Sequence, residues 1–375
     1  MDRYQHNYRR RELHQKNDPE KASALGRIFG TEYVVPSARP FGELPVPVVT
    51  REEFDSLLRF VDLAKAKGFN VSCHVLPINP VSRALASLSC IDIAGNRAVE
   101  TDFIVQACPN NPNISHFGET LVREIVASWP SVDMLDLNHM EYPRWPHLEL
   151  SELFVCFCEF CQKKAESQGI DFDQMKQEVV ALYSTLVTAS PAGPTPLSNV
   201  SVMDMANFLL KRPQLAVWLN FRTASMTEFI TRVTKAAREA AREHNPDLQI
   251  GIDVHLPSIC YLFGTDFTEL YPLYDWVSPK FPDYVPGSVI PLIADEIASK
   301  TGRWGASELV AVLRELHDLG PGPKEYPAAE DPNQSTLYSS EVFDTPDIVR
   351  RQMKYIKPIL GKVPVHPLVF IPDRD

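Results

Sequence analysis

The sequence predicts an α/β fold built on a parallel (β/α)8 barrel of the TIM type. Short, nearly apolar β-rich segments alternate with amphipathic helical segments, which is typical of a parallel sheet covered on both faces. Proline residues follow the ends of several β-rich segments, which fits loops that leave a strand, because proline has no backbone N–H to donate to a neighbouring strand. The chain of 375 residues has the length of one barrel with insertions. A doubly wound open sheet is the alternative, but no Gly-x-Gly-x-x-Gly turn follows any predicted strand.

The elements follow from hydrophobic periodicity and from their end signals. Thr50 and Glu53 form a capping box at the start of the first helix, and Gly68 ends that helix. The expected helices are 50–67, 117–129, 346–359, and one helix or a helix pair at 213–244. The expected strands are 69–76, 132–138, 248–255, 276–281 and 363–370.

These segments make five strands, and Glu32–Val35 is a candidate sixth. Because about eight strands close a barrel of this type, either weak strands lie in the N-terminal part or terminal strands are missing from this chain. We expect residues 1–48 to form an irregular extension. Residues 49–375 should form the barrel, with a helical insertion at about 157–212.

Charge and hydropathy exclude several classes of partner. The formal net charge of −11 argues against nucleic acid, since no basic face compensates for it. The chain has no apolar run of about 18 residues, so no transmembrane helix is expected. The N-terminal segment lacks the apolar stretch of a secretion signal. We therefore expect a cytoplasmic protein with no nucleic-acid or membrane partner, and the sequence leaves a homo-oligomer open.

Polar side chains gather at the carboxyl ends of the predicted strands, which is where a parallel barrel carries its functional groups. A glycosidase needs two carboxyl groups, one as acid and one as nucleophile or base. Asp136, Glu141 and Asp253 are the candidate catalytic residues, although burial with structural hydrogen bonds is an equal alternative for Asp136. The candidate substrate-binding residues are His74, Asn138, His139, His255, Lys280 and His366.

Four cysteines have the spacing of a metal site. Cys156, Cys158 and Cys161 lie in one Cys-x-Cys-x-x-Cys loop, which suits tetrahedral zinc with a fourth ligand from elsewhere. Cys108 precedes the same βα unit and is the candidate fourth ligand. Reduced buried thiols, or a redox pair within the loop, are the alternatives. The other three cysteines are expected to be small core residues: Cys73, Cys90 and Cys260.

Together these motifs resemble the β-galactosidases of glycoside hydrolase family 42 and related barrels described as hypothetical glycosyl hydrolases. The likeness covers roughly residues 68–285 and is specific around 106–162. It rests on the cysteine-proline at Cys108, on the strand that ends in Asn138 and an acid, and on the cysteine loop, with a further similar segment at 264–279. The resemblance implies a (β/α)8 barrel, a carbohydrate substrate, a general acid at the end of the Asn138 strand, and structural zinc held by the four cysteines.

The chain departs from the family pattern at both catalytic positions. Family 42 has a glutamate directly after the asparagine, whereas His139 follows Asn138 here and Glu141 comes two residues later. The family's nucleophile is a glutamate near the end of the seventh strand, whereas the last strand here offers only His366 and, further on, Asp373. The first hypothesis is a glycoside hydrolase. The others are a barrel that binds sugar without hydrolysis, a subunit of a complex, or a metal-dependent sugar isomerase or lyase that uses Asp253, His255 and His139.

Overall fold

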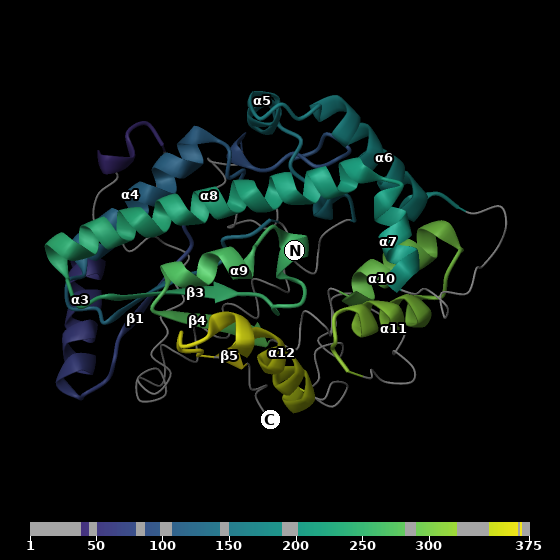
Figure 1. Ribbon diagram of the computed structural model, residues 1–375. Helices are drawn as coiled ribbons and strands as arrows, with labels where there is room; N and C mark the ends of the chain where they lie inside the picture. The colour runs from purple at the N-terminus through teal and green to yellow at the C-terminus, as the bar shows by residue number, and fades with distance from the viewer. Residues whose placement is uncertain are drawn as a thin grey trace.

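Five parallel strands form one sheet at the centre of the molecule (Figure 1). The computed structural model describes residues 39–44, 51–79, 87–97, 107–142, 150–189, 202–281, 290–320, 345–366 and 368–369. The strands are β1 Ser72–Val75, β2 Met134–Leu137, β3 Gln249–Val254, β4 Trp276–Phe281 and β5 Leu368–Val369. Each lies within one of the five predicted segments, so the strand predictions are confirmed.

The strand order distinguishes the two predicted architectures. The strands are hydrogen-bonded in the order β1-β2-β3-β4-β5, and every pair is parallel. A doubly wound sheet reverses its strand order at a switch point, whereas consecutive strands of a (β/α) barrel are always neighbours. The sheet therefore has barrel order, and the described residues contribute five strands to it. The candidate strand Glu32–Val35 lies outside the described residues.

Helices connect the strands and cover the sheet. The predicted first helix is α3 and the predicted C-terminal helix is α12, while residues 213–244 form one continuous helix, α8. Thr50, of the predicted capping box, lies outside the described residues. The α-helices are α3 Arg51–Ala66, α4 Pro112–Ser128, α5 Glu159–Ser167, α6 Phe172–Val187, α7 Val202–Leu210, α8 Pro213–His244, α9 Phe267–Leu270, α10 Ile290–Thr301, α11 Ala306–Leu316 and α12 Thr345–Leu360. Short 3-10 helices lie at η1 Arg39–Phe41, η3 Leu150–Leu153, η4 Cys260–Phe263 and η5 Tyr271–Leu273.

The long helix α8 runs across the molecule and packs along α4 (Figure 1). Gly118 permits the close approach, since a Cβ there would lie 2.8 Å from the Pro77 carbonyl oxygen and 3.1 Å from the side chains of Phe229 and Val233. Burial of this shared apolar face stabilises both helices far more than their intrinsic propensity does. The predicted insertion at 157–212 contains α5, α6 and α7, with residues 190–201 outside the described part.

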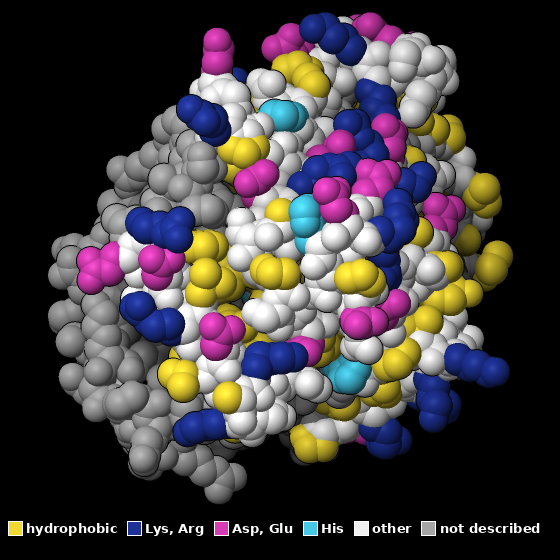
Figure 2. All heavy atoms as spheres, turned by 90° about the vertical axis from the view of Figure 1, so that its left-hand side faces the viewer, with side chains coloured by type: hydrophobic (Ala, Val, Ile, Leu, Met, Phe, Trp, Pro, Cys, Tyr) yellow, Lys and Arg dark blue, Asp and Glu magenta, His cyan; other side chains and the backbone are white. Residues whose placement is uncertain are grey.

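Acidic and basic side chains are interspersed over the face of the molecule shown in Figure 2. Ion pairs of this mixed kind join neighbouring elements, for example Arg232 to Glu119 at 2.7 Å and Lys164 to Glu228 at 2.7 Å. Exposed pairs contribute about 0–1 kcal/mol each. No helix among the described residues is long and apolar enough to span a bilayer.

Alternate residues of the strands point to opposite faces of the sheet. On one face, Leu135, Leu137 and Ile250 are buried in the apolar core. The other face carries His74, whose register partner is Asp136, which in turn lies opposite Gly251. Because the side-chain period is two, Asp253 shares this face with Gly251. The polar groups of three adjacent strands thus meet on one side of the sheet.

Gly251 makes room for the ring of Trp276. A Cβ at Gly251 would lie 2.0 Å from Trp276 Cε2, and the tryptophan is 5% exposed, so the ring would have to move within packed surroundings. We expect Gly251→Ala to destabilise the protein by about 1–3 kcal/mol, the usual cost of overpacking. In the matched control Gly305→Ala, the nearest atom is 4.0 Å from the new Cβ, and the change should cost less than about 1 kcal/mol. Equal urea midpoints for the two variants would contradict this packing argument.

Candidate functional site

Six polar side chains gather at the carboxyl ends of β1, β2 and β3, and we call them the strand-end cluster. All but His74 are buried, with exposed fractions of 5% or less. His74 is exposed and marks the side from which solvent reaches the group. The members of the cluster are His74, Asp136, Asn138, Glu141, Asp253 and His255.

One half of the cluster centres on His74. Its Nδ1 lies 2.5 Å from Asp136 Oδ2 and 3.9 Å from Asp253 Oδ2. Its Nε2 faces the side-chain amide of Asn138, whose Oδ1 accepts a hydrogen bond from the His139 backbone N–H at 2.8 Å. Contacts on both ring nitrogens fix the orientation of the imidazole between the two aspartates.

The other half centres on Glu141. His255 Nε2 lies 3.2 Å from Glu141 Oε2, and His139 Nδ1 lies 3.8 Å from Glu141 Oε1. The loop after β2 turns sharply here, because His139 adopts a left-handed backbone conformation with φ 54°, which is uncommon outside glycine. This turn brings Glu141 back toward His255 at the end of β3. The rings of two histidines therefore lie beside the buried carboxyl group of Glu141.

Two predicted binding residues have different surroundings. Lys280 belongs to β4, on the same strand face as Ser278, and its side chain lies outside the described part. The ring of His366 packs edge-on against Trp276 with centroids 5.6 Å apart, and its backbone N–H donates to the Val277 carbonyl. His366 thus lies beside the first half of β4, away from the carboxyl ends of the strands. The roles of both residues in binding stay predictions.

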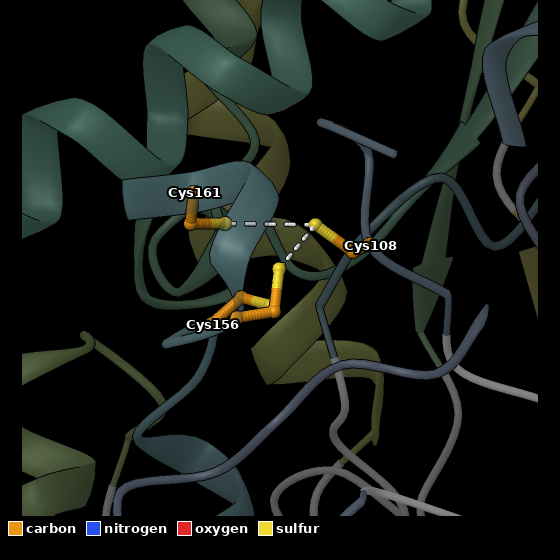
Figure 3. A group of neighbouring side chains, drawn as sticks. Cys108, Cys156 and Cys161 are labelled. Atoms are coloured by element: carbon orange, nitrogen blue, oxygen red, sulfur yellow. Dashed lines mark hydrogen bonds between the residues drawn. The ribbon is translucent and has the colours of Figure 1, made fainter. Parts of the chain in front are cut away.

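The four predicted zinc cysteines meet in space, and their sulfur atoms all lie within 4.8 Å of one another (Figure 3). Cys108 Sγ lies 3.5 Å from that of Cys161 and 3.4 Å from that of Cys158, while Cys156 and Cys158 are 3.5 Å apart. A tetrahedral Zn–S distance of about 2.3 Å requires sulfur atoms about 3.8 Å apart. All four side chains are buried, so the group has the size and the donor set of a closed structural zinc site.

The local fold explains this convergence. Cys158 is the N-cap of α5 and Cys161 lies in its first turn, so one helix start presents both thiols. Cys108 approaches from the loop that precedes α4, as Figure 3 shows. Burial raises the pKa of the Cys108 thiol well above its usual value, because a lone thiolate is poorly solvated there. A bound cation would reverse this penalty, since metal coordination favours the thiolate.

Sequence reasoning did not identify the residues around the cysteines. The Asn110 amide donates to Cys161 Sγ at 3.2 Å, and Lys164 Nζ donates to Asn110 Oδ1 at 2.9 Å. Cys90 and Cys260 are buried core residues, as predicted, whereas Cys73 is half-buried. The Cys90 thiol faces the carbonyl of Ala107, next to Cys108, at 3.4 Å.

Tyr142 follows Glu141 directly and packs against residues of α8 and of the segment before Gly264. Tyr142 N–H donates to the Phe263 carbonyl at 3.0 Å, and its ring packs on the guanidinium of Arg222 at 4.5 Å. Arg222 is buried, and burial lowers its pKa even though the nearby tyrosine and cysteines favour its charge. Gly264 leaves space for the tyrosine ring, because a Cβ there would lie 2.5 Å from it.

Comparison with known proteins gives structural neighbours only. No protein-family model matches the chain, and no curated protein matches its sequence. A GH42 β-galactosidase from G. stearothermophilus, solved as a catalytic mutant, is similar over 70% of this chain and 37% of its own, with 13% identity and a TM-score of 0.40. The β-galactosidase of Halorubrum lacusprofundi has 13% identity over 90% of this chain and 47% of its own, with a TM-score of 0.44.

A second kind of glycosidase is also among the similar structures. The catalytic domain of the β-amylase from Paenibacillus polymyxa has 11% identity over 76% of this chain and 80% of its own, with a TM-score of 0.44. The chain spans less than half the length of the β-galactosidases it matches. Family 42 proteins, to which the sequence motifs bear a resemblance, are thus among its structural neighbours.

Proposed function

We propose that this protein is a glycoside hydrolase whose chemistry takes place at the strand-end cluster. The observation that supports the proposal is the gathering of three buried carboxyl groups at the carboxyl ends of adjacent parallel strands. Oxygens of Asp136 and Asp253 lie within 4.8 Å of one another and of a His74 nitrogen. Glu141 is held by His255, which follows Asp253 by two residues. A barrel enzyme carries its catalytic groups at this end of the strands.

Glycosidic hydrolysis divides naturally between the two halves of the cluster. Glu141 is 4% exposed and lies apart from the pair formed by Asp136 and Asp253, so we assign to it the role of the acid that protonates the leaving oxygen. Asp136 and Asp253 supply the negative charge that activates the attacking water and stabilises an oxocarbenium-like transition state. In this assignment His74, Asn138, His139 and His255 orient the carboxyl groups and offer hydrogen bonds to sugar hydroxyls.

The direct test is hydrolysis of a panel of aryl glycosides by the purified full-length chain. We expect release of the aryl group from at least one glycoside, with Asp136→Asn slowing the reaction at least about 100-fold. Binding of a sugar without release from any substrate would instead support the non-hydrolytic barrel. Release unaffected by Asp136→Asn would place the chemistry elsewhere.

We further propose that Cys108, Cys156, Cys158 and Cys161 hold a structural zinc ion. Their thiol donor set, their mutual distances and their burial support this assignment. Zinc bound by four thiolates has no open coordination position, so its contribution is to fix the loop before α4 against the start of α5.

A further inference from the structure

We propose that His74, Asp136 and Asp253 form a second metal site, which binds a divalent cation at the open side of the strand-end cluster. Each residue offers one ligand atom, and the three atoms lie within 4.8 Å of one another. The donors are one imidazole nitrogen and two carboxylate oxygens, a set suited to divalent cations such as Mn²⁺. The site is distinct from the four cysteines, whose soft thiolates select zinc.

The three ligands come from adjacent strands of the same sheet. His74 in β1 and Asp136 in β2 are register partners. In β3, the register partner of Asp136 is Gly251, and Asp253 follows it by two residues, so its side chain points to the same face. Because Gly251 has no side chain, β3 places none directly beside Asp136 on this face. Ligands held on strands keep their separation better than ligands on loops, so this site needs little rearrangement to bind an ion.

An unsatisfied oxygen points to a missing partner at this place. Asp136 is 5% exposed, and its Oδ1 accepts no hydrogen bond from the residues that the structure describes. Its Oδ2 faces His74 Nδ1 at 2.5 Å. A buried carboxylate oxygen without a partner loses its hydration with nothing to replace it, and a second carboxylate nearby adds repulsion. A divalent cation satisfies the oxygen and neutralises the pair.

Of the three proposed ligands, His74 is the one that solvent reaches. The His74 side chain is 32% exposed, whereas those of Asp136 and Asp253 are 7% and 1% exposed. Three protein ligands leave coordination positions for water, the arrangement found in catalytic rather than structural metal sites. This inference goes beyond the proposed hydrolysis, because the site can bind a cation whether or not the protein hydrolyses glycosides. If both hold, His74, Asp136 and Asp253 would hold the cation, which would supply a Lewis acid that lowers the pKa of a bound water.

Manganese is the appropriate probe, because it binds weakly to thiolate sites and its free ion gives a six-line electron paramagnetic resonance signal. Zinc-loaded protein is titrated with Mn²⁺ in the absence of any sugar. We expect loss of the free-ion signal up to one Mn²⁺ per chain. Asp253→Asn and His74→Ala should each weaken the affinity more than about tenfold. The control variant Glu269→Gln alters an exposed residue of α9 and should bind as the unaltered protein does.

His74→Ala distinguishes loss of a ligand from loss of the fold, because a partly exposed imidazole ring can be removed with less risk to folding than a buried aspartate. Thermal unfolding of each variant identifies those that fold. An unaltered protein that binds no Mn²⁺ at millimolar concentration would overturn the proposal, and so would undiminished binding by folded His74→Ala. Because the titration contains no substrate, its failure leaves the hydrolase proposal standing. Mn²⁺ binding by a protein inactive on every glycoside would refute only that other proposal.

Discussion

Removal of zinc is expected to lower the thermal unfolding midpoint by about 10 °C or more, because structural zinc contributes a large fraction of folding stability where it is bound. The four thiols join the loop before α4 to the start of α5, so without the ion two buried segments lose their connection. The thiols themselves would remain buried and close together, with only weak S–H hydrogen bonds between them. Elemental analysis should find one zinc per chain, and treatment with a strong chelator should produce the lower midpoint.

Single substitutions locate the effect. Cys161→Ser removes a ligand at the first turn of α5 and should give both the lower midpoint and substoichiometric zinc. Cys73→Ser is the matched control, since Cys73 lies on β1 outside the group of four and should leave the zinc content unchanged. Purified protein without zinc, whose four thiols react freely with Ellman's reagent, would contradict the assignment.

The strands could be predicted from the sequence because their local pattern and their tertiary role agree. Strands that are covered on both faces need nearly continuous apolar runs. The short runs at 132–138 and 248–255 have this pattern, which indicates a buried parallel strand. The helices α10 and α11 lay outside the predicted elements, although Leu309, Val310 and Leu313 in α11 have helical spacing and pack in or against the core. The helical periodicity of these two segments is present in the sequence, but it stands between long stretches rich in proline, which favour an irregular interpretation.

Some residues of the candidate site could likewise be predicted from the sequence, and others could not. Asp136, Asp253 and His255 were identified because the end of a parallel strand is a position that sequence periodicity can locate. Arg222 and Asn110 could not be identified, because their importance comes from contacts with residues distant in the chain. Arg222 lies in the first third of α8, on a helix surface where an arginine normally faces solvent. Only the folded protein places its guanidinium against the rings of Tyr142 and Trp218.

Substituting Glu141 by glutamine should slow hydrolysis about 10²–10⁴-fold for glycosides with poor leaving groups, the range expected for loss of general acid catalysis. The physical reason is specific to the leaving group. An alcohol of high pKa departs only if it is protonated as the bond breaks, whereas a dinitrophenolate departs without protonation. Glu141→Gln should therefore retain much more of its activity on dinitrophenyl glycosides than on alkyl or phenyl glycosides.

The dependence on leaving group separates a catalytic role for Glu141 from a structural one. His255 and His139 both contact the Glu141 carboxyl group, so a glutamine that disturbs their positions would slow every substrate by a similar factor. Glu269→Gln, an exposed change of the same chemistry, should alter neither rate nor leaving-group dependence. A uniform loss across the series in folded Glu141→Gln would assign Glu141 to positioning. The proton donor would then have to be sought in the Asp136–Asp253 pair, which lies on the other side of the cluster.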